Sequence, residues 1–564
     1  MEALTLNPGL VPIIAALLIL AMPRTARSPM IVASALAAFW LLLDHEFGAG
    51  GAMVQMGLPV VPFKLDELNR IFGITLLIAL IVIGIYSGAR RNRYEDAAIL
   101  LLAGSAVSAL FVGDLISFVA ALALGGLAAA WVVFASPLEG ASRAGARLLI
   151  WHGLEGLLFL VGVAFHLSSG TAALAVGRLD ITSIGGAFIF AALMIRVGAP
   201  AMHVWLKDVI SHASPTGAGA LSSFTTMLGV YALARSFPSE PLLIWIGAAM
   251  VVVGALYAAA ENDLRKAAAY ALTMQTGLCV ALVGIGTPLA LAGAEAHAFA
   301  TILSFLALQL TFGALLERHG SVGLSQLAGV GQTMPITAVL LLGCGLAVSA
   351  APGLAMFASQ AASLEAAAQW DLRWLWTMIW AMPGVVFVAL LVRPALAIYT
   401  PTGEVRPIKE APFSMILGAV VALFLCFAVG LAPRWLFDLM PSEISFEPFE
   451  IDRVAPQLQL LGAAGVAFLA LRAARAAPRD QDVRLLDIDA LYRGPLAGAG
   501  RWAGVLALRV YGAWQSWTRR MSEAGGRSLA ALAQACDRPY AQAGTAAATF
   551  FCLAAMLLVM FLVR

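Results

Sequence analysis

The stretch that decides the fold runs from Ile184 to Arg235 and reads IGGAFIFAALMIRVGAPAMHVWLKDVISHASPTGAGALSSFTTMLGVYALAR. It begins as an apolar helix whose single full charge is Arg196, and Pro200 and His203 follow soon after. A cation in an apolar span costs roughly 2.5–3.5 kcal/mol, so it normally faces a bundle interior or a water-filled path. Proline in such a helix frees backbone carbonyls, which a membrane tolerates where they line protein or water. A charged, interrupted helix of this kind predicts an ion-handling element.

The composition indicates a polytopic membrane protein. Of 564 residues, 61% are hydrophobic and 12% are charged, and the mean hydropathy is +0.90, whereas soluble domains carry about 25% charged residues. The net charge of +2 gives no basis for nucleic-acid binding. The cysteines lack metal-ligand spacing, and no nucleotide loop, haem motif or hydrolase motif is present. We therefore expect no catalytic residue, cofactor or metal, and any redox chemistry would belong to partner subunits.

Apolar runs of helix-spanning length, about 20 residues each, follow one another with short connections. The Gly/Pro-rich residues 47–64 are expected to form a loop, and residues 352–368 are expected to form half a helix. Glu295 and Glu365 are expected to lie at the ends of spans, near the membrane interface. Cations concentrate after the first, third, fifth and ninth runs, which places the N-terminus outside the cell (inner) membrane by the positive-inside rule. The runs are 9–22, 30–43, 66–87, 97–112, 114–134, 146–167, 184–206, 218–237, 242–260, 267–286, 297–316, 336–351, 372–396, 413–439, 456–474 and 546–563.

Residues 477–540 stand apart as a long insert before the last run. Within them, residues 501–527 place Trp502, Trp514 and Trp517 among arginines. This pattern is typical of an amphipathic helix at a bilayer surface or against a partner. The alternative is a cytoplasmic cap that packs on its own bundle.

A series of motifs follows in sequence order after the fifth apolar run. They are Arg196, AMHVWLK at 201–207, PTG at 215–217, DLRKAAAY at 263–270, HAFAT at 297–301, the segment 352–360, and LDIDALYR at 486–493. Together they resemble the antiporter-like subunits shared by respiratory complex I, membrane-bound hydrogenases and Mrp-type cation/proton antiporters. The last motif is similar to the tail of D-type Mrp subunits. No single motif is specific, but their order and spacing make the resemblance strong.

The resemblance implies an all-α polytopic membrane protein, an antiporter-like bundle with two inverted five-helix repeats containing broken helices. Breaks expected at Pro200 and at Pro352–Gly353 agree with this, because paired interruptions are typical of inverted repeats. We expect N-terminal helices over residues 1–93, a first repeat over 94–237 and a second repeat over 238–398. C-terminal helices should follow over 399–476, then the insert over 477–540 and a final helix over 541–564.

The departures from the family pattern bear on function. Where members place a glutamate on the fifth span this chain has Ala123, and Arg196 stands where they have the broken-helix lysine. Thr301 and Gln360 replace two further lysines, and residues 218–237 hold none. A buried lysine can take up and release a proton, whereas arginine stays charged and threonine and glutamine do not titrate. A proton relay built on lysine and glutamate is therefore altered at most of its residue positions.

Some titratable groups remain as candidates for a proton or ion path. Glu155 follows His152 by three residues, so both lie on one helix face. If that face meets Arg196, Glu155 supplies the counter-charge missing at Ala123; otherwise it faces a polar crevice or a partner subunit. His203 and His297 occupy family histidine positions and could carry protons or be structural.

Two groups of charged residues are expected at the ends of spans. Asp66 and Asp114 are expected to cap helices. Asp263, Arg265 and Lys266 are expected to form a cytoplasmic charge cluster, for which the positive-inside rule is a sufficient cause.

Two functions remain open from the sequence. The chain could translocate protons, or exchange them for Na⁺, within a multi-subunit Mrp-like or complex I-like assembly of antiporter-like neighbours in the lipid bilayer. Alternatively, it is a relay-inactive structural or coupling subunit, or an accessory of a redox or inorganic-carbon uptake complex. A working path requires titratable or hydrated groups across the bundle, whereas a scaffold can leave the central axis dry.

Overall fold

The structure is a computed structural model whose chain divides into two units, residues 1–485 and 486–564. The described residues are 6–51, 53–55, 58–89, 92–168, 176–400, 408–440, 446–476, 487–488, 490, 494 and 497–535. The expected final span, 546–563, and most of the 486–493 motif lie outside these residues.

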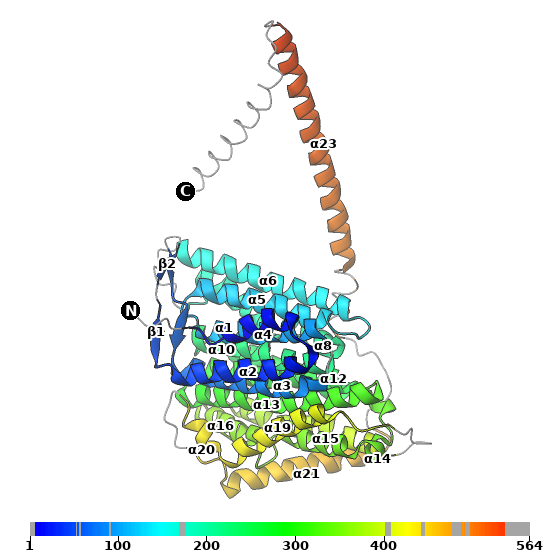
Figure 1. The fold of residues 1–564 in the computed structure, drawn as a ribbon. Helices are drawn as coiled ribbons and strands as arrows, with labels where there is room; N and C mark the ends of the chain where they lie inside the picture. The colour runs from blue at the N-terminus through cyan, green and yellow to red at the C-terminus, as the bar shows by residue number, and fades with distance from the viewer. Residues whose placement is uncertain are drawn as a thin grey trace. The chain divides into compact units, whose positions relative to one another are not determined.

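The first unit is a bundle of helices that run side by side (Figure 1). Among the described residues, 12 helices are long and apolar enough to cross a membrane, counting α9–α10 and α17–α18 as one each. The N-terminal part contains α1 (Leu10–Leu18), α2 (Arg24–Asp44), α3 (Glu67–Tyr86), α4 (Arg93–Phe111), α5 (Leu115–Phe134) and α6 (Ala141–Ser168). The middle contains α7 (Ile184–Val197), α8 (Val204–His212), α9 (Pro215–Phe224), α10 (Thr226–Ser236), α11 (Pro241–Ala260), α12 (Leu264–Ile285) and α13 (Pro288–His319).

The remainder of this unit follows α13 in the same bundle. It contains α14 (Val330–Thr333), α15 (Pro335–Val348), α16 (Ala355–Gln369), α17 (Arg373–Phe387), a π-helical turn (Val388–Val392), α18 (Arg393–Tyr399), α19 (Phe413–Leu431), α20 (Pro433–Phe437) and α21 (Ile451–Ala473). The expected all-α membrane fold is confirmed.

The loop expected at 47–64 instead contains four short strands. Strand β1 (Gly48–Gly50) pairs antiparallel with β4 (Phe63–Leu65), and β2 (Met53–Gln55) pairs antiparallel with β3 (Leu58–Val60). We call the end of the bundle that carries these strands the hairpin end (Figure 1).

Helix capping explains several boundaries. Asp66 forms a capping box with Asn69 at the start of α3, and Asp114 accepts a hydrogen bond from the backbone N–H of Ser117 at 2.8 Å at the start of α5. Such side chains satisfy amide groups that have no partner within the helix. The capping roles expected for Asp66 and Asp114 are confirmed.

Both broken helices contain a pair of residues with left-handed backbone. The helix expected over 184–206 ends at Val197, where Gly198 has φ 71°, and Ala201 also has φ 71°. The break therefore begins at Gly198, which favours this conformation, and Pro200 lies inside the turn. The second break has the same three-residue spacing, with φ 51° at Ala350 and 89° at Gly353.

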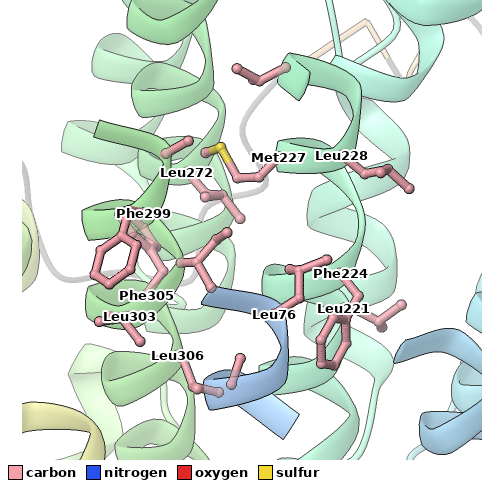
Figure 2. Close-up of a cluster of buried hydrophobic side chains, with 14 of the residues drawn as sticks. Leu76, Leu221, Phe224, Met227, Leu228, Leu272, Phe299, Leu303, Phe305 and Leu306 are labelled. Carbon is pink, nitrogen blue, oxygen red and sulfur yellow. The ribbon is translucent and has the colours of Figure 1, made fainter. Parts of the chain in front are cut away.

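Helix α13 forms the centre of the first unit and contacts helices from both halves of the bundle. Figure 2 shows apolar side chains meeting there, among them Leu76 of α3, Phe224 of α9, Met227 of α10 and Leu272 of α12. This cluster is buried almost completely. It joins the helices before and after α11 into one core.

The second unit contains the long helix α23 (Ala497–Ala535). It includes the stretch 501–527 in which the sequence predicts an amphipathic helix. Trp502, Trp514 and Trp517 are 70%, 61% and 53% exposed within this chain. Docking against a bilayer surface or a partner remains a prediction.

Candidate functional site

The candidate site lies where α5, α6 and α7 pack together. Glycines allow this packing: a Cβ added to Gly162 of α6 would lie 2.8 Å from the carbonyl oxygen of Gly185 on α7. A Cβ on Gly126 of α5 would lie 2.9 Å from the Cβ of His152. Close contact between these helices brings polar side chains together inside an apolar bundle.

Arg196, Glu155 and His152 form one buried network. The Nε of Arg196 donates to Oε1 of Glu155 at 2.7 Å, and Oε2 of Glu155 lies 2.6 Å from Nδ1 of His152. The side chains of Arg196 and Glu155 are each 2% exposed. The structure thus places the helix face of His152 and Glu155 against Arg196, the first of the arrangements that the sequence left open.

The surroundings of Arg196 hold its guanidinium in place. Its Nη2 lies 3.4 Å from the carbonyl oxygen of Leu122, and Trp205 donates its indole N–H to the carbonyl oxygen of Ile195 at 3.0 Å. On the side of α10, a Cβ added to Gly229 would lie 2.8 Å from the Cγ of Arg196. The arginine is therefore fixed by packing as well as by charge.

Ala123 lines the same small cavity as His152, Glu155 and Arg196. The counter-charge of Arg196 thus comes from Glu155 on α6, and Ala123 on α5 borders the same cavity. The cavity has a volume of about 10 Å³, and one water requires roughly 10–15 Å³ on this scale. At most one water fits beside the ion pair.

His203 belongs to an aromatic cluster at the break between α7 and α8. It is 2% exposed, and its ring lies 6.4 Å from that of Tyr257 and 6.0 Å from that of Tyr270. The ammonium of Lys207 lies 5.4 Å from the ring centre of Tyr270, within cation–π range. A ring contact of 5.2 Å between His152 and Trp205 connects α8 to the ion pair.

His297 belongs to a separate cluster formed by α12, α13 and α16. Its Nδ1 lies 3.0 Å from the hydroxyl of Ser359, and its Nε2 lies 3.0 Å from Oε1 of Gln275. Gln360, expected from the family resemblance to stand at a relay position, donates its side-chain amide to the carbonyl oxygen of Ile379 at 2.7 Å. The five candidate path residues thus occupy three places in the bundle.

The charge cluster expected at 263–266 contains a helix cap and a buried arginine. Asp263 accepts from the backbone N–H groups of Arg265 and Lys266 at 2.9 and 3.1 Å. The guanidinium of Arg265 is buried and donates to the carbonyl oxygens of Ser211 and Ala213 at 3.3 and 2.7 Å. A cation at these carbonyls satisfies the end of α8 and favours its dipole. Arg265 therefore joins α12 to α8.

Glu295 differs from its expected place at the interface. It lies inside α13 and is 5% exposed, with an Oε2 that has no hydrogen-bond partner among the described residues. The reason is that α13 begins at Pro288, with Thr287 as its cap. A Thr–Pro pair is typical of a helix start and could have identified Glu295 as intrahelical.

Several other buried polar atoms have no protein partner in the described residues. Each such atom costs roughly 1–3 kcal/mol if it stays dry, so these atoms indicate positions for water. They include His152 Nε2, the hydroxyls of Thr216, Thr226 and Thr301, and the side-chain amide of Gln309. Most lie on α9, α10 and α13. No group of three or more potential metal-ligating side chains occurs in the described part of the chain.

The chain is similar to subunits of known membrane complexes. It is 22% identical over 391 residues to the D-type subunit of the Na⁺/H⁺ antiporter of Bacillus subtilis, covering 63% of this chain and 79% of that protein. A chain of respiratory complex I from Thermus thermophilus has a TM-score of 0.68 at 22% identity, covering 81% of this chain and all of that one. A chain of the archaeal membrane-bound sulfane sulfur reductase has a TM-score of 0.70 at 18% identity, and the match covers 98% of this chain and 99% of that one.

The family follows from a match that spans more than half of the sequence. Residues 72–384 match the model described as NADH:quinone oxidoreductase/Mrp antiporter, transmembrane. This range includes both broken helices and the network of His152, Glu155 and Arg196. The chain therefore belongs to the NADH:quinone oxidoreductase/Mrp antiporter family of membrane subunits.

Proposed function

We propose that this chain translocates protons, or exchanges them for Na⁺, through a modified relay in a multi-subunit Mrp-like or complex I-like assembly. The observation that carries the proposal is the buried network of His152, Glu155 and Arg196. In this proposal the neighbours are other antiporter-like membrane subunits, and any redox chemistry resides in them. The assembly lies in the cell membrane with the N-terminus outside.

Arg196 acts in this relay as a fixed charge. Its guanidinium cannot release a proton in the physiological range, so it cannot cycle as a lysine does. Glu155 and His152 form the unit that can exchange a proton, because they share a contact of 2.6 Å. The Nε2 of His152 has no protein partner among the described residues and offers a second position for a proton or water. Arg196 then holds Glu155 in place as its counter-charge.

Buried hydroxyls on α9, α10 and α13 support the same function. The hydroxyls of Thr216, Thr226 and Thr301 are buried without a protein partner in the described chain. Hydroxyl groups can both donate and accept, so they can hold a water wire without titrating. His203, His297 and Glu295 are the titratable groups that would link to such a wire.

The second candidate is a relay-inactive structural or coupling subunit. The apolar cluster in Figure 2, with Phe224 and Met227 packed against α3 and α12, favours it because it occupies the junction between the two halves. In that case the chain docks antiporter-like neighbours or serves a redox or inorganic-carbon uptake complex. The likeness in fold to a chain of a sulfane sulfur reductase is compatible with such a role.

Flux measurements in vesicles that hold the whole complex distinguish the two. Proton and Na⁺ flux are compared between wild type, Glu155→Gln and Arg196→Ala. Arg196→Lys serves as the variant that restores the residue type of the family. Loss of flux in the first two variants with the complex intact, and retention or gain in the third, is the expected result. Flux that persists in all variants and falls only when the whole chain is removed would establish the scaffold role.

A further inference from the structure

An apolar cavity at the hairpin end opens between α16, α17 and α21. Its volume is about 260 Å³. Most of its wall is hydrophobic, formed by Phe357, Ala361, Leu364, Ala368, Trp376, Trp380 and Pro456. A mostly apolar concavity with a few polar groups is typical of a binding site for a small amphiphile.

Stacked tryptophans give the depth of this cavity in the membrane. Trp245 stacks on Trp374 with ring centres 4.9 Å apart, and Trp376 stacks on Trp380 at 6.3 Å. Trp245 is 64% exposed, and Trp374 and Trp376 are each 37% exposed. Exposed tryptophans gather at the level of lipid headgroups. The part of the cavity beside Trp376 therefore lies near the headgroup region.

The interior of the cavity offers few free polar groups. Gln360 donates its amide to the carbonyl oxygen of Ile379 at 2.7 Å, and Gln457 donates to the carbonyl oxygen of Ala350 at 3.0 Å. Apart from Glu365, Asp452 and Arg453, the remaining wall is apolar. An acyl chain fits such a wall, whereas a polar headgroup would lose its hydration there.

The charges around the cavity favour a cationic head. Glu365 and Asp452 line it together with Arg453. Arg453 lies 3.5 Å from Glu365 and 3.6 Å from Glu450, and its guanidinium stands 4.3 Å from the ring centre of Phe446. Two carboxylates thus lie within 4 Å of the Arg453 guanidinium, and a third, that of Asp452, lines the same cavity. The excess of negative charge attracts an ammonium group, tryptophan faces can add cation–π attraction, and the guanidinium can bind a phosphate.

We propose that this cavity binds one zwitterionic aminophospholipid of the phosphatidylethanolamine class. One acyl chain occupies the apolar interior. The ammonium group lies by Glu365 and Asp452, and the phosphate lies by Arg453. An anionic phospholipid or a free fatty acid matches the apolar wall, but its negative charge is repelled by Glu365 and Asp452.

The test uses the full-length chain purified with its accompanying subunits. Native mass spectrometry counts bound lipid after exchange into detergent with phosphatidylethanolamine or phosphatidylglycerol added. We expect one phosphatidylethanolamine per chain in the wild type. Ala361→Phe, which fills the cavity, should abolish its binding. Glu365→Gln should weaken it about tenfold, equivalent to 1.4 kcal/mol, and thereby reduce the preference over phosphatidylglycerol.

Asp371→Asn is the matched control, because its carboxylate is exposed near the same end of the bundle but does not line the cavity. It should bind phosphatidylethanolamine as the wild type does. If Ala361→Phe fails to assemble, Glu365→Gln decides alone. Equal binding in Glu365→Gln and wild type, a wild-type preference for phosphatidylglycerol, or a cavity filled by side chains of a neighbouring protein would each overturn the proposal. None of these outcomes depends on flux.

Discussion

The buried ion pair of Glu155 and Arg196 should respond asymmetrically to loss of either partner. Glu155→Gln leaves the guanidinium without a counter-charge, and removal of one partner from a buried pair costs about 3–5 kcal/mol. Both side chains are 2% exposed, so water cannot take over the lost interaction. Arg196→Met should cost less, about 1–3 kcal/mol, because Glu155 keeps its contact with His152 at 2.6 Å.

The double variant Glu155→Gln/Arg196→Met isolates the interaction between the two residues. It carries no unpaired charge, so its cost should fall short of the sum of the two single costs by about 2–3 kcal/mol. The measurement is reversible unfolding by dodecyl sulfate in mixed micelles, followed by intrinsic fluorescence. The exposed pair Arg373–Asp371, with 91% and 84% exposed side chains, serves as the control cycle and should show no coupling.

Two results would refute this reasoning. The first is a coupling below about 0.5 kcal/mol, which is the additivity expected of independent sites. The second is a larger cost for Arg196→Met than for Glu155→Gln. That order would mean that His152 does not take over as the partner of Glu155.

Three further variants test the surroundings of this network and the capping of α3. Ala123→Glu alone should destabilise the fold by overpacking, typically by about 1–3 kcal/mol. In combination with Glu155→Ala it should give a more stable protein than Glu155→Ala alone, because the new carboxylate can pair with Arg196. No recovery of stability in thermal unfolding would contradict a shared counter-charge position. Gly229→Ala should lower thermal stability and flux together, because its Cβ would meet the Cγ of the buried Arg196 side chain at 2.8 Å, whereas Gly153→Ala, with nothing within 4 Å, should be neutral or stabilising. Burial raises the pKa of Asp66, but the hydrogen bond and charge of Arg235 outweigh this effect, so the pKa lies below its ordinary value. The stabilising contribution of Asp66 should therefore be present above about pH 4 and vanish as pH falls through the folded pKa. Asp66→Asn should remove that part of the acid sensitivity in a pH series of unfolding curves.

Local sequence signals predicted the elements of the fold well. Apolar runs of spanning length correspond to the long helices, and Asp66 and Asp114 were recognisable as caps because capping depends on residues within one turn. Hydropathy begins the corresponding apolar run at His297 and so places Glu295 before the span, whereas α13 begins at Pro288. A carboxylate can lie inside a span when the surrounding bundle accommodates it, and hydropathy alone does not record that.

The first break illustrates what local sequence leaves undecided. Pro200 predicts that the helix cannot continue, but the helix already ends at Val197 because Gly198 takes the left-handed conformation. Both residues permit an interruption. Which of them ends the helix depends on how α7 and α8 pack against their neighbours.

The sequence by itself determined the membrane class, the two broken helices and the shared face of His152 and Glu155. Only the tertiary structure decided that this face meets Arg196 and that Ala123 borders the same cavity. The physical reason is that helical periodicity orders side chains around one helix axis. The choice of facing helix depends on contacts between segments far apart in the chain, here the close packing of α5, α6 and α7 at their glycines.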